Sequence, residues 1–127
     1  MLNTDHTKPI YIQIAEWLET EILNGNLKVD EKVYSQYKLA EMFTINPATA
    51  AKGLNLLYEE DILYNKRGLG KFVTKDAKEI IVNKRKNQKL KNLIEELVLE
   101  SERLEMRDGE LMEMVQAVIM EKREEGK

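Results

Sequence analysis

The sequence contains no cysteine, only one histidine, and no apolar run approaching the roughly 20 residues that a membrane-spanning helix needs. The absence of cysteine excludes a disulfide framework and a thiolate metal site. The single histidine, His6, lies in a polar stretch, residues 1–8, that lacks the apolar region of a signal peptide. No nucleophile–base pair, metal cluster or phosphate-binding loop is evident. We therefore expect a cytoplasmic protein that is not an enzyme, with no cofactor, metal or membrane partner.

Charge is unevenly distributed along the 127 residues, which carry 20 basic and 23 acidic side chains and a net charge of −3. Residues 32–75 hold seven basic and four acidic residues, and residues 77–91 hold six basic and one acidic residue. Surfaces that bind nucleic acid are basic because they neutralise phosphates. The first basic segment is therefore compatible with a modestly basic DNA-binding face within an acidic chain. The lysines between Lys84 and Lys91 form either a solvated helix face or a second DNA contact.

Two short helices joined by a tight turn are predicted in the centre of the chain. Asn46 is a preferred N-cap and Pro47 fits the first helical position, so a helix over residues 47–60 is expected. A shorter helix over residues 36–43 follows a second N-cap, Ser35. Helices joined in this way form a helix-turn-helix unit, whose second helix enters the DNA major groove.

The remaining pattern predicts a mainly α fold with a small β-hairpin wing. A helix over residues 10–24 ends before Gly25, and strands over 62–65 and 71–74 flank a glycine-containing turn. Two further helices follow, over residues 77–107 and 110–124, with Asp108 as a possible N-cap between them. These elements form a winged helix-turn-helix domain, residues 1–75, and a C-terminal helical-hairpin dimerisation unit, residues 76–127.

Four ordered motifs resemble the GntR family of bacterial transcription regulators. They are Pro9–Ile14 (Pro-Ile-Tyr-Ile-Gln-Ile), Ile22–Leu27 (Ile-Leu-Asn-Gly-Asn-Leu), Val33–Ala40 (Val-Tyr-Ser-Gln-Tyr-Lys-Leu-Ala) and Gly68–Val73 (Gly-Leu-Gly-Lys-Phe-Val). The match covers residues 9–74, and the short tail is most similar to the YtrA-like branch. The resemblance implies a homodimeric repressor of its own operon and of neighbouring ABC transporter genes, bound to a roughly palindromic double-stranded operator. A small-molecule effector, if there is one, is not identified by the sequence.

The resemblance transfers the DNA contacts only in part. Tyr37 stands where the family has a DNA-contacting arginine, Tyr34 replaces a proline, and Pro47 stands where many members carry another arginine. Two guanidinium groups, the commonest readers of guanine, are therefore missing. The remaining candidates for contact with DNA are Ser35, Tyr37, Lys38, Asn46, Pro47, Ala48, Thr49, Lys52, Lys66, Arg67, Gly68, Gly70 and Lys71.

Several of these residues also have a purely structural interpretation. Thr49 can simply stabilise its helix, Gly68 and Gly70 can simply make a hairpin turn, and Tyr37 can be a half-buried aromatic between helices. At the level of function, the missing arginines leave room for a winged-helix module that binds a protein and has lost productive DNA reading.

Apolar residues in the last two helices exceed what two helices can bury between them, which predicts a second copy of the chain as partner. The methionines Met106, Met112, Met114 and Met120 then pack the core or the dimer interface, or else line an apolar effector pocket. The candidate dimerisation residues are Leu90, Leu93, Ile94, Leu97, Leu104, Leu111, Val115, Val118 and Ile119.

Overall fold

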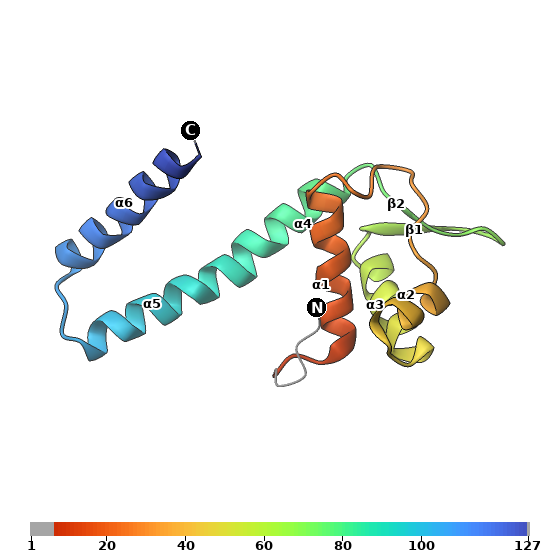
Figure 1. The fold of residues 1–127 in the computed structure, drawn as a ribbon, viewed down its shortest axis with the longest axis horizontal. Helices are drawn as coiled ribbons and strands as arrows, with labels where there is room; N and C mark the ends of the chain where they lie inside the picture. Colours follow the sequence, from red (N-terminus) through yellow and green to blue (C-terminus); the bar gives the residue numbers. More distant parts are fainter. Residues whose placement is uncertain (1–6, 127) are drawn as a thin grey trace. The chain divides into compact units, whose positions relative to one another are not determined.

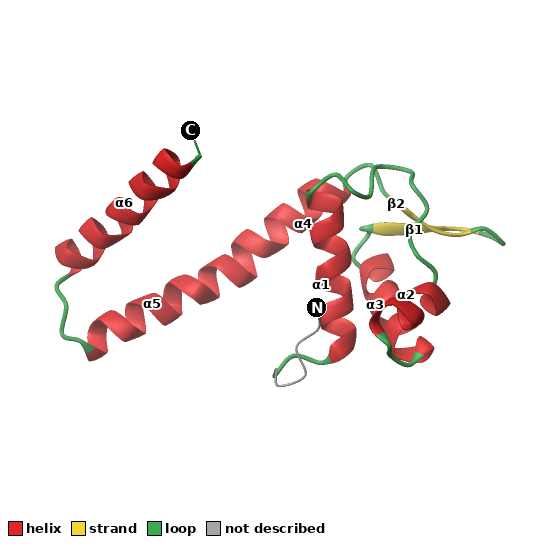
Figure 2. Cartoon of the chain, viewed as in Figure 1, coloured by secondary structure: helices red, strands yellow, loops and turns green. Residues whose placement is uncertain are grey.

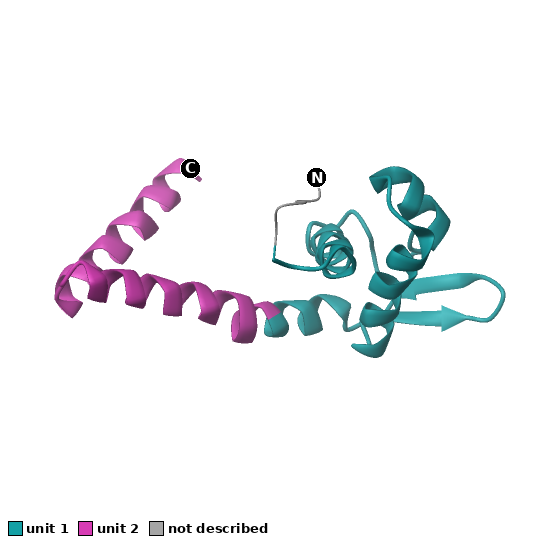
Figure 3. Ribbon diagram, turned by 90° about the horizontal axis from the view of Figure 1, so that it is seen from below, with its two compact units in different colours: residues 1–84 teal, residues 85–127 magenta. Residues whose placement is uncertain are grey.

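The structure, a computed structural model, describes residues 7–126, so His6 lies outside the described residues. The chain divides into two compact units, Met1–Lys84 and Arg85–Lys127 (Figure 3). The first unit holds several α-helices and a two-stranded antiparallel hairpin (Figure 1). In the described part of the second unit the regular elements are helices, joined by a short turn. The predicted fold, mainly α with a hairpin wing, is confirmed.

Helix α1, Ile10–Leu23, ends as the sequence predicts at a glycine in the left-handed region. Gly25 has a φ of +80°. Its backbone N–H donates to the carbonyl of Ile22, and the next N–H, of Asn26, donates to the carbonyl of Glu21. These two bonds are a Schellman motif, which satisfies the last carbonyls of the helix.

Helices α2, Gln36–Phe43, and α3, Pro47–Glu59, begin at the two predicted caps. The hydroxyl of Ser35 accepts a hydrogen bond from the Lys38 N–H at 3.1 Å, and Oδ1 of Asn46 accepts one from the Ala48 N–H at 2.8 Å. Thr44, with a φ of 54°, turns the chain between the helices. Together α2 and α3 form the predicted helix-turn-helix.

The wing is an antiparallel hairpin of β1, Leu63–Lys66, and β2, Gly70–Val73 (Figure 2). Each strand is shifted by one residue from the predicted range. The outer edge of β2 is covered by residues 30–33, through backbone bonds such as that from the Val33 N–H to the Lys71 carbonyl, at 2.9 Å. A side-chain bond from the Tyr64 hydroxyl to Asp30, at 2.7 Å, holds this segment against the hairpin.

The core of the first unit forms where α1 crosses α3. Gly53 makes this crossing close, since a Cβ on it would lie 2.8 Å from the Tyr11 carbonyl oxygen. The inward-facing residues of α3, Ala50, Gly53, Leu54 and Leu57, are all buried, and the hairpin and helix α4, Ala77–Arg85, add their own apolar side chains. Fully buried members of this core include Ile14, Leu18, Leu39, Ala50, Leu57, Ile62, Ala77 and Ile81.

Helical backbone continues beyond the wing through α4, Ala77–Arg85, the π-helical segment η1, Lys86–Leu90, and α5, Lys91–Arg103. Because Ala77 and Ile81 are buried in the core, the first compact unit extends to Lys84, nine residues beyond the predicted boundary at residue 75. The division of roles between the two parts stays a prediction.

The turn between the last two helices differs from the predicted one. Helix α5 ends at Arg103, four residues early, and Glu105 turns the chain with a φ of 56°. Helix α6 spans Asp108–Glu125, so Asp108 lies inside the helix, and the predicted cap at Asp108 is wrong. The N-cap position belongs to Arg107, whose side chain makes no capping hydrogen bond. The acidic Asp108 is instead placed in the first turn, where the helix dipole favours it.

Candidate nucleic-acid interface

The first turn of α3 presents a short polar edge. Asn46 uses its side-chain oxygen as the cap, and the N–H of Thr49 donates to the Asn46 carbonyl at 3.0 Å. Ala48 is exposed, whereas Pro47 and Thr49 are half-buried. No acidic residue lies in this turn. The positive end of the helix dipole is therefore offset by no carboxylate in the first turn, which favours an anion such as a phosphate.

Lys52 lies one turn further along α3, and its ammonium is held by a side chain of α1. Its Nζ lies 4.1 Å from the centre of the Tyr11 ring, a cation–π contact. The ammonium is thus directed toward the beginning of α1. Tyr11, a residue of the Pro-Ile-Tyr motif, fixes where the Lys52 charge is presented.

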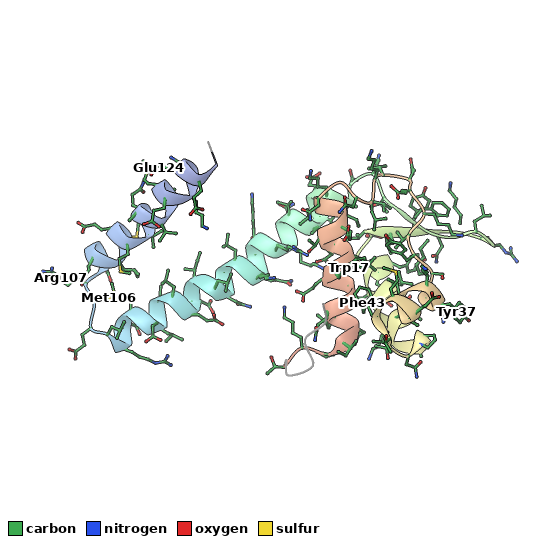
Figure 4. The ribbon with its side chains drawn as sticks, in the orientation of Figure 1. Trp17, Tyr37, Phe43, Met106, Arg107 and Glu124 are labelled. Atoms are coloured by element: carbon green, nitrogen blue, oxygen red, sulfur yellow. The ribbon has the colours of Figure 1, made fainter. Side chains whose placement is uncertain are left out.

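Tyr37 projects from the start of α2 and is 69% exposed. Figure 4 shows it at the outer edge of the helix, away from Trp17 and Phe43, which pack edge-to-face at 5.0 Å. The interpretation of Tyr37 as a half-buried aromatic is therefore wrong. The neighbouring Lys38 is exposed, and its Nζ lies 3.8 Å from Oε1 of Glu41. A surface ion pair of this kind contributes little to stability.

The wing carries its cations over aromatic rings. Lys66 Nζ lies 4.5 Å from the Phe72 ring centre, and Lys71 Nζ lies 5.0 Å from that of Tyr58 and 2.8 Å from the Asn65 side-chain oxygen. These contacts restrain the lysine stems and leave charge at the surface.

The turn of the hairpin requires its two glycines. Gly68 has a φ of +78° and Gly70 a φ of +115°, values that other residues adopt only with strain. Their conformational role is thus established by geometry, whether or not they also approach DNA. The exposed Arg67 stands beside Gly68 at the tip.

A groove of about 490 Å³, here called the wing groove, separates the start of α2 from the hairpin. It brings together seven of the predicted residues: Ser35, Tyr37, Lys66, Arg67, Gly68, Gly70 and Lys71. It also includes Lys32, Tyr34 and Gln36, which the sequence did not single out as contacts. The other predicted residues, Lys38, Asn46, Pro47, Ala48, Thr49 and Lys52, do not line it.

The charge of the wing groove has one sign. Its basic side chains come from Lys32, Lys66, Arg67 and Lys71, and among the described residues that line it none carries a carboxylate. The sequence around Lys32 does not indicate that it belongs to this groove, because the hairpin residues beside it are distant in sequence. The chain as a whole has a net charge of −3, so this concentration of cations is a feature of the folded surface.

Lys84, within the second basic segment, is ion-paired rather than a freely solvated charge. Its ammonium pairs with Glu19 of α1, which is 1% exposed, and at 2.9 Å with Glu60 at the end of α3. Burial lowers the pKa of Lys84, but the hydrogen bonds that its ammonium donates to Glu19 and then to Glu60 outweigh burial and raise the pKa above the usual 10.5. The remaining basic residues of this segment include the exposed Lys86, Lys89 and Lys91.

The second unit exposes most of its apolar side chains. Leu111 and Val115 are half-buried. Ser101, near the end of α5, is buried, and its hydroxyl donates a 2.7 Å hydrogen bond to the Val98 carbonyl. The other candidate dimerisation residues are 40–64% exposed: Leu90, Leu93, Ile94, Leu97, Leu104, Val118 and Ile119. Met112, Met114 and Met120 are also exposed, so they do not form a core within one chain.

Residues 7–126 contain no group of three or more histidine, cysteine or carboxylate residues placed to hold a metal ion. Within the same range, no helix combines the length and apolar character needed to cross a membrane.

Comparison with known proteins places these features in a family, although no protein-family model matches the chain. It is 40% identical over 78 residues to the HTH-type transcriptional repressor NagR of Bacillus subtilis, covering 61% of this chain but only 32% of NagR. The chain therefore spans about a third of that relative's length. It is 29% identical over 93 residues to the HTH-type transcriptional repressor YtrA of Bacillus subtilis, covering 73% of this chain and 71% of YtrA.

A solved structure decides the assignment. A GntR family transcriptional regulator from Listeria monocytogenes superimposes with a TM-score of 0.69 at 30% identity, over 89% of this chain and 97% of that one. The chain belongs to the GntR family of transcriptional regulators. The DNA-binding domain of AraR, solved in complex with operator ORR3, also matches this GntR chain, with a TM-score of 0.52 and 27% identity over 58% of this chain and 89% of that one.

The resemblance to the GntR family and its YtrA-like branch is thus confirmed. The named relatives and neighbours of this GntR chain are transcription regulators and not enzymes, as predicted.

Proposed function

We propose that this chain is a homodimeric, sequence-specific DNA-binding repressor. Each protomer places the start of α3 in the major groove and its hairpin against the adjacent backbone. The observation that carries this proposal is the uncompensated positive end of α3 in the same compact unit as an all-cationic wing groove, in a chain of net negative charge. The match to a DNA-binding domain solved on its operator supports it.

Dimerisation is supported by the apolar surface of the second unit. Side chains such as Leu93, Leu97 and Val118 are about half exposed within one chain. Each leucine or valine withdrawn from water stabilises an association by about 1.5–3 kcal/mol when fully buried, so leaving them in solvent is costly. A second copy with the same faces is the partner that symmetry favours, and it gives a roughly palindromic operator.

The regulated genes follow from the family resemblance and not from geometry. We propose that the protein represses its own operon and neighbouring ABC transporter genes, as the YtrA-like branch implies. Such binding to the chromosome would place the protein in the cytoplasm. An effector, if one exists, is of unknown chemistry.

A second candidate function is a winged-helix module that binds another protein and has lost productive DNA reading. The observation that favours it is the replacement of the family arginine by Tyr37, which is 69% exposed and displays an aromatic ring where a guanidinium is expected. Exposed tyrosines are enriched at protein interfaces.

A gel-shift titration with the promoter of the chain's own gene separates the two functions. A DNA-binding repressor retards this fragment at concentrations that leave a scrambled fragment of equal length free. A protein-interaction module retards neither fragment, or both equally.

A further inference from the structure

Lys32 lines the wing groove, and both its backbone and its side chain contact the hairpin. Its backbone forms a bridge with Phe72 of β2. On either side, the Val33 N–H donates to the Lys71 carbonyl at 2.9 Å, and the Val73 N–H donates to the Glu31 carbonyl at 3.1 Å. The backbone that carries Lys32 is therefore bound along the outer edge of β2 rather than being a free loop.

The side chain of Lys32 lies against Gly70. A Cβ added to Gly70 would lie 3.2 Å from Cε and 4.0 Å from Nζ of Lys32. The absence of a side chain at Gly70 thus leaves room for the lysine stem as well as permitting its own φ of +115°. An ammonium positioned by packing loses less conformational entropy when it meets a ligand than one on a freely rotating stem.

The charge of Lys32 is available for an external anion. Within residues 7–126, no carboxylate forms an ion pair with Lys32, whereas Lys38 and Lys84 do have acidic partners. Three further cations, Lys66, Arg67 and Lys71, line the same groove. Several cations in one groove are expected to bind successive phosphates of the DNA backbone rather than the edge of a base pair. Such phosphate contacts position the protein on DNA but do not distinguish one sequence from another.

We propose that the wing groove holds one sugar–phosphate strand of the DNA, with Lys32 as a phosphate contact. This inference rests on the proposed DNA-binding function and adds a residue and a role to it. Base reading belongs to the start of α3, and Lys32 supplies affinity that does not depend on sequence. Gly70 acts in this account by making room for Lys32, not by touching DNA itself.

The test compares full-length wild type with Lys32→Gln, which removes the charge and keeps most of the stem. Fluorescence anisotropy gives the affinity for an own-promoter duplex and for a scrambled duplex over a range of salt concentrations. Each lost phosphate contact lowers the slope of log K against log salt by about 0.9, so a dimer with two such contacts loses about 1.8. Affinity is expected to fall by the same factor for both duplexes.

The matched control is Lys28→Gln, which neutralises an exposed lysine of the same connecting segment that does not line the groove. It should keep the wild-type slope. Thermal unfolding followed by the fluorescence of Trp17, the only tryptophan, checks that both variants are folded.

The inference is overturned if folded Lys32→Gln keeps the wild-type slope, or if it weakens binding to the promoter duplex alone, which would mean base reading. In either case Arg67→Ala, which removes a charge at the tip of the wing, can still flatten the slope and uphold the proposed function. Wild type that binds no duplex overturns both.

Discussion

At the scale of single residues, the helix-turn-helix is specified by a few side chains whose effects are local. Asn46 caps α3 through its own oxygen, and Ser35 does the same for α2. Both could be identified from sequence because a cap and the N–H groups it satisfies are within three residues of each other. Thr49 follows in the first turn of α3, where its hydroxyl can donate to a phosphate and its methyl can meet a thymine.

Thr49→Ala should weaken binding to the own-promoter duplex by about 1 kcal/mol or more, because it removes a polar contact to a charged phosphate. Fluorescence anisotropy on promoter and scrambled duplexes measures the change. Asn55→Ala serves as the control, since Asn55 is exposed further along α3 and bonds to Glu59 at 3.2 Å. If folded Thr49→Ala binds the promoter duplex like wild type, the residue is purely structural.

Other residues could not be placed from sequence, because their partners are far away in the chain. Lys84 gives no local sign that it pairs with Glu19, 65 residues earlier, or with Glu60. The contact of Lys32 with Gly70 could not be predicted from sequence for the same reason, since the two residues are far apart in the chain. The turn at Glu105 was also missed, because a non-glycine residue at a φ of 56° carries no signal comparable to that of Gly25.

At the scale of elements, α4 is held on the first unit by apolar packing and by one ionic cluster. Ala77 and Ile81 supply the packing, and Lys84 links α4 to α1 and to the end of α3. The hydrophobic periodicity of α4 was readable, but its attachment to the winged domain was not, since the periodicity does not tell which partner a helix has. The packing of Ala77 and Ile81 and the ion pairs of Lys84 extend the first unit past the predicted boundary at residue 75.

Lys84→Met should lower the free energy of unfolding by about 3 kcal/mol, because it removes the ammonium that pairs with the buried Glu19 carboxylate. Urea unfolding followed by Trp17 fluorescence measures the loss. The control is Lys78→Met, an exposed lysine of the same helix, for which a change within about 0.5 kcal/mol is expected. Equal stability of the two variants would show that the cluster does not hold α4.

The same cluster predicts a dependence on alkaline pH. Hydrogen bonds raise the pKa of Lys84 above 10.5 in the folded chain, so its stabilising contribution is complete below pH 10.5 and is lost as pH rises through the higher folded value. The stability difference between wild type and Lys84→Met should therefore shrink at high pH. Tyr64, whose pKa is raised by its bond to Asp30, is common to both proteins and cancels. A difference that stays constant from neutral pH to beyond the folded pKa contradicts the assignment.

At the scale of the whole molecule, the account requires two copies of the chain. One copy leaves the apolar faces of α5 and α6 in water, and one copy offers a single recognition helix. Two linked half-sites bind more tightly than one because the second contact forms at high effective concentration. The sequence predicted this partner from an excess of apolar residues, and the exposure of those residues within one chain is the corresponding structural observation.

Leu93→Glu combined with Leu97→Glu should convert the full-length chain from a dimer to a monomer, since it places charge on an apolar face that is to be buried. Size-exclusion chromatography with light scattering at micromolar concentration measures the mass. Glu96→Gln, on the same helix, should leave the dimer intact. A wild-type chain that is already monomeric in this experiment would contradict the dimer.

The central claim is that a dimer of this chain reads a specific DNA sequence, and one titration tests it most directly. Full-length protein is titrated into labelled own-promoter duplex and into a scrambled duplex at the same salt concentration, with anisotropy as the readout. The account predicts two protomers per duplex and an affinity for the promoter about a thousandfold or more above that for the scrambled duplex. Equal affinity for the two duplexes, or no binding to either, would contradict it.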